Sequence, residues 1–337
     1  EIVSVIQDKI RDYEKQLEYK QNKVKNCLER IGGFPVEEFC KENIMEPIIG
    51  MKEPFYYRNK AQFPVGVNKE GKVAIGFYAG RTHSIIDTSH CYIQAPVNDE
   101  ILQRVRKFIE EYEISVYNEE KQEGLFRHIL TRVGFTTGEI MVCLIINGNA
   151  LPHKEQFIAS LCEISHMTSI SININKEKTN VILGDKVKTL WGKSYITDNI
   201  GDIKYQISPL SFYQVNPIQT KVLYETALSY ADLHGEETVW DLYCGIGTIS
   251  LFLAQKAKQV YGVEIVPQAI DDAKKNAEIN HITNAEFFVG AAEEILPQKY
   301  KEDSICADVI VVDPPRKGCE ESLLDTIIQM APKRMVY

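Results

Sequence analysis

The sequence predicts an α/β protein in which a region with a mostly antiparallel sheet precedes a parallel sheet covered by helices. Three observations support this fold class. Strand-like and helix-like segments alternate after about residue 216, and short alternating apolar runs broken by glycine fill residues 56 to 210. A strand also leads through a glycine turn into a helix at Trp240 to Ile249. We therefore expect an α+β domain followed by a Rossmann-like domain.

Composition limits the class of protein further. The chain has 337 residues, 44% of them hydrophobic, which suffices for about two cores. It has no apolar run long enough to cross a membrane and no secretory signal at its start, so we expect a cytoplasmic protein without a membrane partner. A net charge of −9 argues against a protein that binds nucleic acid through its overall electrostatic field, but it allows a local basic groove. No obligate protein partner is evident.

Three regions follow from the patterning. Residues 1–50 should form an amphipathic helix, ended near Gly32, and a connection; their balanced charges favour a solvated helix over a binding arm. Residues 51–205 should form the central α+β domain, with a covering helix over 157–165. Strands are expected over AQFPVGV, KVAIGFY, HILTRVGF, EIMVCLIIN and TNVILGDKVKTLWG, and KYQISPL continues the pattern to about residue 210. Residues 206–337 should form the Rossmann-like domain, with an incomplete parallel sheet.

Elements of the third region can be placed individually. Asn216 is a favoured helix N-cap and Pro217 suits the first helical position, so a helix should run to about Tyr230. The alternation then predicts strands at 238–242, 259–264, 285–289 and 308–313, and helices at 247–256, 267–280 and 320–331. A fifth strand should begin within APKRMVY.

Chemically distinctive residues fall at the carboxyl ends of the predicted strands, where such sheets bind nucleotides. Gly245 and Gly247 form the turn after the first strand. Glu264 ends the second, where a carboxylate can accept hydrogen bonds from ribose hydroxyls, and A-A-E-E (291–294) follows the third. Asp313 ends the fourth, before two stiffening prolines. A dinucleotide enzyme has no need of this D-P-P turn, whereas S-adenosylmethionine methyltransferases use it to bring methyl group and acceptor together.

Several motifs resemble the RNA uracil-5-methyltransferases, which make 5-methyluridine in transfer RNA and large-subunit ribosomal RNA. The resemblance covers nearly the whole chain. Its motifs are YRNKAQFPVG (57–66), GFYAGRTHSI (76–85), ISPLSFYQVNPIQT (207–220), DLYCGIGTISL (241–251), GVEIVPQAIDDAKKNA (262–277) and VDPPRKGC (312–319).

This resemblance implies S-adenosyl-L-methionine as cofactor and assigns residues to its site. Gln214 matches the glutamine that holds the cofactor, and Tyr243 and Glu264 match residues along its amino-acid end and ribose. Gly245 belongs to the same turn, and Asp313 matches the carboxylate near the methyl-transfer centre. Thr248 stands where some members have a cofactor-contacting asparagine. An RNA partner is implied too, with ribosomal RNA favoured over transfer RNA.

The chemistry that the resemblance implies needs two further residues. Uracil C5 becomes nucleophilic when a cysteine thiolate adds to C6, and a base later removes the C5 proton. Family members carry that cysteine in a Ser-Cys-Asn segment after the fifth strand and a glutamate further on, so we expect both after Tyr337 and no catalytic residue within this chain. The expectation is thus a truncated, inactive chain. Cys319, at the mouth of a predicted helix, is the alternative thiolate; we favour a structural role for it.

An iron–sulfur cluster, present in many members, is not expected. Cys91 matches its last ligand, but the other ligands would fall near Val3 to Ile6, where this chain has no cysteine. The eight cysteines are scattered without a C-x-x-C pair, so the sequence predicts no metal site.

We expect the central sheet to carry the RNA surface, because basic and aromatic residues alternate there. These residues are Arg58, Lys60, Arg81, Arg127, His128 and Arg132, with Tyr56, Tyr57, Phe63, Phe77, Tyr78 and Phe126. An aromatic core with solvated arginines is the alternative.

Two other functions stay open. Methyltransferases acting on amino groups of adenine or guanine also use a D-P-P turn, but usually follow it with a stacking Tyr or Phe, where this chain has Arg316. The second alternative is a non-catalytic RNA-binding scaffold that keeps the cofactor-binding fold.

Overall fold

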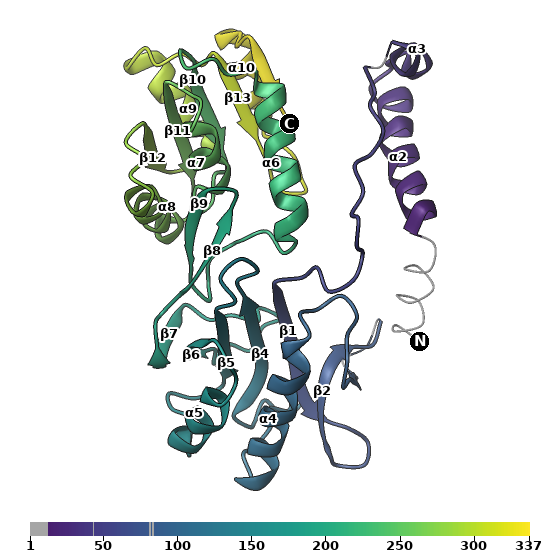
Figure 1. Cartoon of the computed structure of the whole chain (residues 1–337), viewed down its shortest axis with the longest axis vertical. Coiled ribbons are helices and arrows are strands. Elements are labelled where there is room, and N and C mark those ends of the chain that lie inside the picture. Colours follow the sequence, from purple (N-terminus) through teal and green to yellow (C-terminus); the bar gives the residue numbers. More distant parts are fainter. Residues whose placement is uncertain (1–12, 43, 81, 83) are drawn as a thin grey trace.

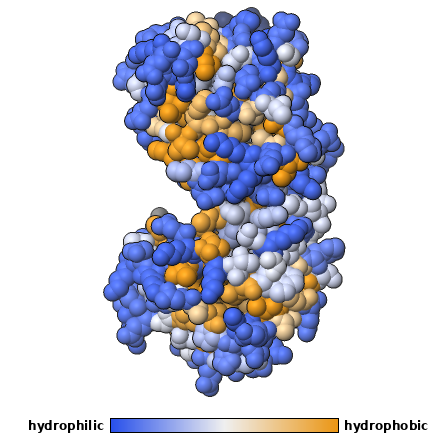
Figure 2. Space-filling model, turned by 90° about the vertical axis from the view of Figure 1, so that its left-hand side faces the viewer, coloured by the Kyte–Doolittle hydropathy of each residue, from blue (hydrophilic) through white to orange (hydrophobic). Residues whose placement is uncertain are grey.

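The computed structural model describes residues 13–42, 44–80, 82 and 84–337. Figure 1 shows a body with a parallel sheet, a second body with an antiparallel sheet below it, and an N-terminal helical segment beside the first body. Figure 2 shows, on another face, a hollow between the two bodies with hydrophobic residues along both of its sides. Among the described residues, no helix combines the length and apolar character needed to cross a membrane.

The N-terminal segment contains α2 (Tyr13–Arg30) and α3 (Val36–Lys41). The helix predicted over residues 1–31 is confirmed from Tyr13 and ends at Arg30, next to Gly32; its first twelve residues lie outside the described part. No residue of α2 is buried. Hydrogen bonds fix α2 to the connection, because Met51 N donates to Tyr13 Oη (2.7 Å) and Ile48 N to Gln21 Oε1 (2.6 Å).

The central body is a seven-stranded sheet in the order β3-β2-β1-β4-β5-β6-β7. It is mostly antiparallel, as predicted, and only β5 and β6 pair in parallel. Helices α4 (Val97–Glu111) and α5 (Lys154–Cys162) cover one face with a hydrophobic core that includes Phe63, Ile129 and Phe157. The strands are β1 (Lys60–Val67), β2 (Val73–Tyr78), β3 (Ile85–Asp87), β4 (Phe126–Val133), β5 (Ile140–Ile146), β6 (Met167–Ile174) and β7 (Lys186–Gly192).

A hairpin joins the two bodies. Its strands β8 (Ile196–Ile200) and β9 (Ile203–Ile207) contact the helices of the parallel sheet. Leu130 and Cys143, on the second face of the central sheet, share one core with Tyr205 of the hairpin and Ile270 of the upper body. The proposed boundary near residue 205 therefore falls within a shared core.

The upper body is a five-stranded parallel sheet in the order β12-β11-β10-β13-β14, which confirms the predicted Rossmann-like fold. Helices α6, α7 and α8 contribute to cores on one side, and α9 and α10 to a core on the other. The strands are β10 (Thr238–Leu242), β11 (Gln259–Glu264), β12 (Ala285–Val289), β13 (Val309–Val312) and β14 (Arg334–Val336), and the helices are α6 (Pro217–Ala231), α7 (Thr248–Ala254), α8 (Pro267–Ile279), α9 (Ala292–Glu302) and α10 (Glu321–Met330).

The structure departs from the predicted elements in several places. Helices α3, α4 and α9 and strands β3, β6 and β8 were not predicted. The strand expected over residues 179–192 begins only at Lys186. The preceding segment is bonded to side chains instead of a neighbouring strand, since Asn175 Nδ2 donates to the carbonyls of Val181 (2.7 Å) and Ile182 (2.9 Å).

Candidate functional site

Three neighbouring strands of the parallel sheet end at the same level. Strand β10 lies between β11 and β13, and Leu242 is paired with Val263 and with Val312. The residues that follow these partners are Tyr243, Glu264 and Asp313. Residues widely separated in sequence therefore meet at one carboxyl edge, as the sequence analysis predicted.

The glycine turn between β10 and α7 uses left-handed backbone conformations. Gly245 has a φ of 55° and Gly247 a φ of 78°, values that glycine adopts without a Cβ penalty. A Cβ placed on Gly245 would meet no other residue within 4 Å, whereas one on Gly247 would lie 3.1 Å from the Ala273 and Phe287 side chains. Gly245 thus borders open space that a ligand can fill, and Gly247 permits close packing of α7.

Glu264 is held against this turn by two backbone groups. Gly245 N donates to Glu264 Oε2 (3.2 Å), and Val266 N donates to Glu264 Oε1 (3.1 Å). Each carboxylate oxygen can accept a further hydrogen bond. The half-buried carboxylate therefore suits two hydroxyl donors, such as those of a ribose.

Asp241 lies buried beneath the turn. Ser250 Oγ donates to its Oδ2 (2.5 Å), while its buried Oδ1 has no hydrogen-bond partner among the described residues. Burial first, and then the charge of Asp313, raise the pKa of Asp241 to about 7, against hydrogen bonds from Ser250 that lower it. Asp241 Oδ1 is therefore an additional polar atom at the site. It can accept a hydrogen bond from a ligand, or it can carry the proton of the neutral carboxyl group.

Thr248, at the start of α7, is held by two tyrosines. Its hydroxyl lies 2.7 Å from Tyr224 Oη, and its carbonyl accepts from Tyr205 Oη (2.9 Å). Burial raises the pKa of Tyr224, so this hydroxyl stays protonated. Because the Thr248 hydroxyl is engaged with Tyr224, its predicted contact with a cofactor stays a prediction.

Gln214 lies in the loop before α6, and its backbone is fixed to the central sheet. Asn59 Nδ2 donates to Gln214 O (2.9 Å), and Asn59 N donates to Val215 O (2.8 Å). The neighbouring Tyr213 is buried in the core that also contains Cys244 of the glycine turn. The loop is therefore anchored near the turn, while the role of the Gln214 side chain stays a prediction.

Cys319 has surroundings that oppose a thiolate. Burial and the Glu293 charge raise its pKa, and a hydrogen bond with the Tyr243 hydroxyl only partly offsets them. The pKa of Tyr243 is itself raised to about 12, first by burial. These contacts support the structural role expected for Cys319.

The predicted RNA surface is wrong for five of its residues, because they are buried. Phe63 and Phe126 belong to the core of the central sheet, and Arg127, His128 and Arg132 are at most 6% exposed. Burial lowers the pKa of His128 to about 4, so this imidazole is neutral. Partly exposed positions are Arg58, Lys60, Tyr56, Tyr57, Phe77 and Tyr78, while Arg81 lies outside the described residues.

Both buried arginines bind backbone carbonyls. Arg127 Nη1 donates to Asn175 O and to Glu177 O (2.9 Å each), and its guanidinium lies 4.5 Å from the Tyr117 ring centroid. Arg132 Nη2 donates to Ser211 O and to Pro209 O. They connect segments of the fold, a role that the basic and aromatic pattern did not reveal.

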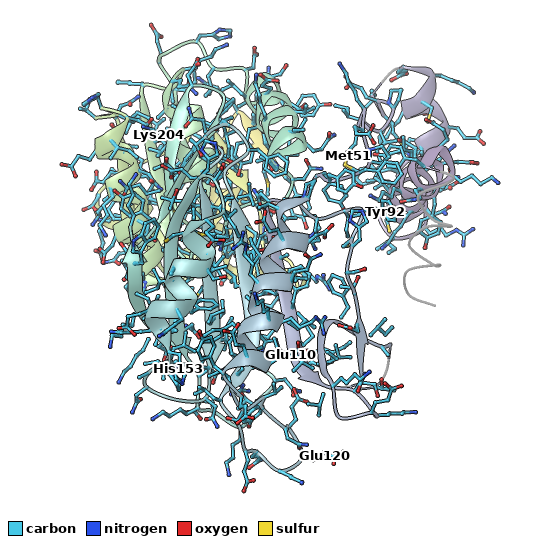
Figure 3. The ribbon with its side chains drawn as sticks, turned by 60° about the horizontal axis from the view of Figure 1, so that its bottom comes forward. Met51, Tyr92, Glu110, Glu120, His153 and Lys204 are labelled. Atoms are coloured by element: carbon cyan, nitrogen blue, oxygen red, sulfur yellow. The ribbon has the colours of Figure 1, made fainter. Side chains whose placement is uncertain are left out.

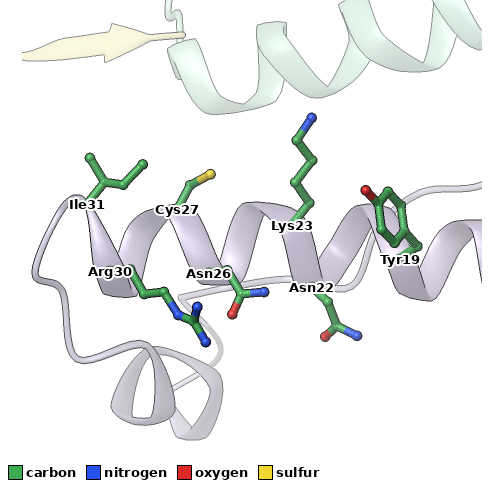
Figure 4. A pocket seen from close by; sticks show the side chains of 7 residues that line it. All are labelled: Tyr19, Asn22, Lys23, Asn26, Cys27, Arg30 and Ile31. Carbon is green, nitrogen blue, oxygen red and sulfur yellow. The ribbon is translucent and has the colours of Figure 1, made fainter.

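No metal centre is built by the described residues, which contain no group of three His, Cys, Asp or Glu side chains able to hold an ion. Cys91 is a partly exposed free thiol. A separate hollow of about 340 Å³ runs along α2 and includes Tyr19, Lys23 and Ile31. Figure 4 shows Lys23, Cys27 and Ile31 pointing away from their helix toward α6. The lining of this hollow contains no acidic residue and none of the predicted site residues.

A few site residues were missed by the sequence analysis. Asn59 and Tyr224 contact the Gln214 loop and Thr248, and Ser250 contacts Asp241, which was itself not predicted. Asn59 falls within the YRNK motif, and Asp241 and Ser250 fall within DLYCGIGTISL, so these motifs were the available signals. Tyr224 lies on an ordinary helical segment, so its contact depends on the fold.

A parallel sheet whose central strand leads into a glycine turn, flanked by Glu264 and Asp313 on the neighbouring strands, is typical of proteins that bind a nucleotide-containing cofactor. The chain belongs to the tRNA (Uracil-5-)-methyltransferase family, whose model matches residues 12–337. The residues around the glycine turn fit S-adenosylmethionine, the methyl donor of this family, because Gly245 leaves open space beside the Glu264 carboxylate.

Relatives support the assignment. An uncharacterized RNA methyltransferase of Halalkalibacterium halodurans is 55% identical over 326 residues, which cover 96% of this chain and 69% of that protein. One from Listeria monocytogenes is 51% identical, with 96% and 70% covered. The crystal structure of Pyrococcus abyssi tRNA (uracil-54, C5)-methyltransferase with S-adenosyl-L-homocysteine has a TM-score of 0.77 and 30% identity, covering 95% of this chain and 72% of that one.

Proposed function

We propose that this protein is an enzyme that methylates C5 of uracil in structured RNA, with S-adenosylmethionine as the methyl donor. The observation that carries the proposal is the meeting of Tyr243, Glu264 and Asp313 beside an open glycine turn, in a chain of the uracil-5-methyltransferase family. Ribosomal RNA is the first substrate class to test, and transfer RNA is the second.

Each residue has a distinct task in this proposal. Glu264 accepts hydrogen bonds from the ribose of the donor, and Gly245 leaves room for its amino-acid end. Gln214 and Tyr243 complete the pocket, and Asp313 lies at the transfer centre. When bound, S-adenosylmethionine supplies an electrophilic methyl group.

The acceptor carbon needs activation, since uracil C5 is a weak nucleophile. A thiolate forms a bond to C6, C5 takes the methyl group, a base removes the C5 proton, and elimination breaks the bond to sulfur. The raised pKa of Cys319 disfavours it as this thiolate. We propose that residues other than Cys319 supply the thiolate and the base.

Uridine deuterated at C5 gives a direct test of the reaction. The full gene product would be incubated with deuterated RNA and methyl-labelled donor. We expect release of one deuterium for each methyl group transferred, because only C5 methylation removes the label. Transfer with full retention of deuterium would favour an amino-group methyltransferase, and donor binding without any transfer would favour the scaffold.

A 5-fluorouridine RNA tests the nucleophile. Fluorine at C5 prevents elimination, so an active enzyme stays bonded to the RNA through its thiolate. We expect the full gene product with Cys319→Ser to form this adduct as the wild type does. Loss of the adduct in the Cys319→Ser protein, with donor affinity unchanged, would make Cys319 the nucleophile.

A further inference from the structure

Two cations face each other across neighbouring strands of the central sheet. Lys60 on β1 is the direct register partner of Arg132 on β4. Side chains at opposed positions of an antiparallel pair lie close together, and like charges there are destabilising. Arg58, two residues before Lys60, adds a third positive charge that lowers the pKa of Lys60.

Nothing acidic among the described residues neutralises this group. The ion pairs of the described part involve other residues, and none includes Arg58, Lys60 or Arg132. Arg132 is 2% exposed, and its buried Nε has no hydrogen-bond partner in that part of the chain. Burying unpaired charge is costly unless an anion compensates it. The arrangement therefore has the electrostatics of an anion site.

Arg132, and the segment that carries Arg58 and Lys60, are bonded to the loop that contains Gln214. Arg132 donates to Ser211 O, and Asn59, between Arg58 and Lys60, donates to Gln214 O. An anion held by Lys60 would thus lie beside a segment already assigned to the cofactor pocket. The half-buried positions of Arg58 and Lys60 leave both accessible from solvent.

Exposed aromatic rings adjoin the same segment. Phe55 and Tyr92 are 37% and 42% exposed, with ring centroids 6.3 Å apart. Tyr56 N donates to Tyr92 O (2.7 Å), and Figure 3 shows Tyr92 on the side of the molecule near the N-terminal helix. Aromatic faces next to cations are the combination that binds single-stranded RNA, through base stacking and phosphate contacts.

We propose that Arg58 and Lys60, with Arg132 beneath them, form the binding site for a backbone phosphate of the RNA strand whose uracil reaches the Asp313 edge. This inference rests on the proposed function. Lys60 and Arg58 contact the phosphate, and Arg132, which is buried, contributes charge from below. Phosphate contacts of this kind fix the register of the RNA without reading its sequence.

Replacement of Lys60 by methionine tests the site, because RNA affinity should fall while thermal stability should not. Lys60→Met keeps most of the apolar stem, and we expect roughly tenfold weaker binding of a uridine-loop RNA hairpin at low salt. The slope of log affinity against log salt should become shallower by about 0.7. Thermal stability should stay equal or rise, because the repulsion from Arg132 is lost. Lys69→Met, in the exposed turn after β1, is the matched control and should change neither quantity.

Conservative replacement gives an independent check. Burial first, and then the charges of Arg132 from β4 and Arg58 from its own segment, lower the pKa of Lys60 to about 8. Wild-type affinity for the hairpin should therefore fall as the pH rises from 7 to 9. Lys60→Arg should restore binding and remove this pH dependence, since arginine stays charged.

Several results would overturn the inference. Equal RNA binding by wild type and Lys60→Met would do so, as would lost donor affinity with RNA binding intact, which would assign the anion to the donor's carboxylate. A drop in thermal stability accompanied by loss of both ligands would mean a structural role. If wild type and every variant failed to bind the RNA hairpin, the proposed function itself would fail as well.

Discussion

Glu264 shows how a single carboxylate can organise the donor site. Both of its oxygens are bonded to backbone N–H groups, of Gly245 in the turn and of Val266 after β11. These bonds fix the carboxylate before any ligand arrives. The position of the Glu264 carboxylate, and with it the binding of a ligand, therefore depends on the conformation of the glycine turn.

Replacing Glu264 by glutamine should weaken donor binding selectively. Glu264→Gln loses the charge and one acceptor, so we expect about tenfold to hundredfold lower affinity for S-adenosylmethionine by calorimetry. The exposed Glu286→Gln on β12 is the control and should bind normally. Unchanged affinity in Glu264→Gln would remove this residue from the site.

Asp241 should make stability depend on pH. Its pKa is raised from 3.8 to about 7, chiefly by burial, so the folded chain holds a proton that the unfolded chain releases. The stability from this group is present at low pH and is lost as the pH rises from about 4 to about 7, by roughly 1.4 kcal/mol per pH unit at most. Denaturant unfolding of wild type and Asp241→Asn across this range measures it. A slope that persists in the asparagine variant would assign the effect elsewhere.

At the scale of elements, the glycine turn combines two different constraints. Gly245 and Gly247 both have positive φ, but only Gly247 faces closely packed side chains. Gly245 thus leaves space for the ligand, whereas Gly247 allows α7 to pack closely against α8. The sequence motif alone did not separate the two roles.

Alanine at each position should separate them. Gly247→Ala should lower the free energy of unfolding by roughly 2 to 4 kcal/mol, from backbone strain and overpacking against Phe287. Gly245→Ala should cost about 1 kcal/mol but strongly reduce donor affinity, because its methyl group enters the open space. Gly235→Ala, another positive-φ position with free space, controls for strain. Equal donor affinity in Gly245→Ala and Gly235→Ala would contradict this assignment.

Element prediction succeeded where local chemistry dominates. Asn216 Oδ1 accepts from Gln219 N (3.0 Å), so the predicted N-cap of α6 is confirmed. Helix α9 lacks such a signal, since Ala291 provides no capping side chain and Pro297 lies inside the helix. The late start of β7 depends on side-chain bonds from Asn173 and Asn175 to the carbonyls of Gly184 and Val181, which the apolar pattern does not reveal.

At the scale of the whole molecule, the β8–β9 hairpin and α8 bring the two bodies together. Asn276 of α8 is fully buried between the hairpin and the glycine turn. Its Oδ1 accepts from Gln206 N of β9 (2.8 Å), and its Nδ2 donates to Ile246 O of the glycine turn (3.2 Å). One side chain thus connects the hairpin to the donor site.

Removing this connection should destabilise the protein as a whole. Asn276→Ala leaves a buried N–H and a buried carbonyl unpaired, so we expect a loss of roughly 2 to 4 kcal/mol in the free energy of unfolding. Glu278→Ala, on the exposed side of the same helix, should change it by less than about 0.5 kcal/mol. Thermal or denaturant unfolding measures both, and similar values for the two variants would contradict the role of Asn276.

The sequence by itself determined the fold class, the strands of the parallel sheet with all of its helices except α9, and the carboxyl edge where Tyr243, Glu264 and Asp313 meet. These follow from periodicity, glycine turns and parallel strand ends, which are local. Only the tertiary structure decided that Arg132 and Phe126 are buried and that Lys60 faces Arg132. Alternation along a strand defines two faces, but what covers each face depends on segments distant in the chain, here α4, α5 and the β8–β9 hairpin.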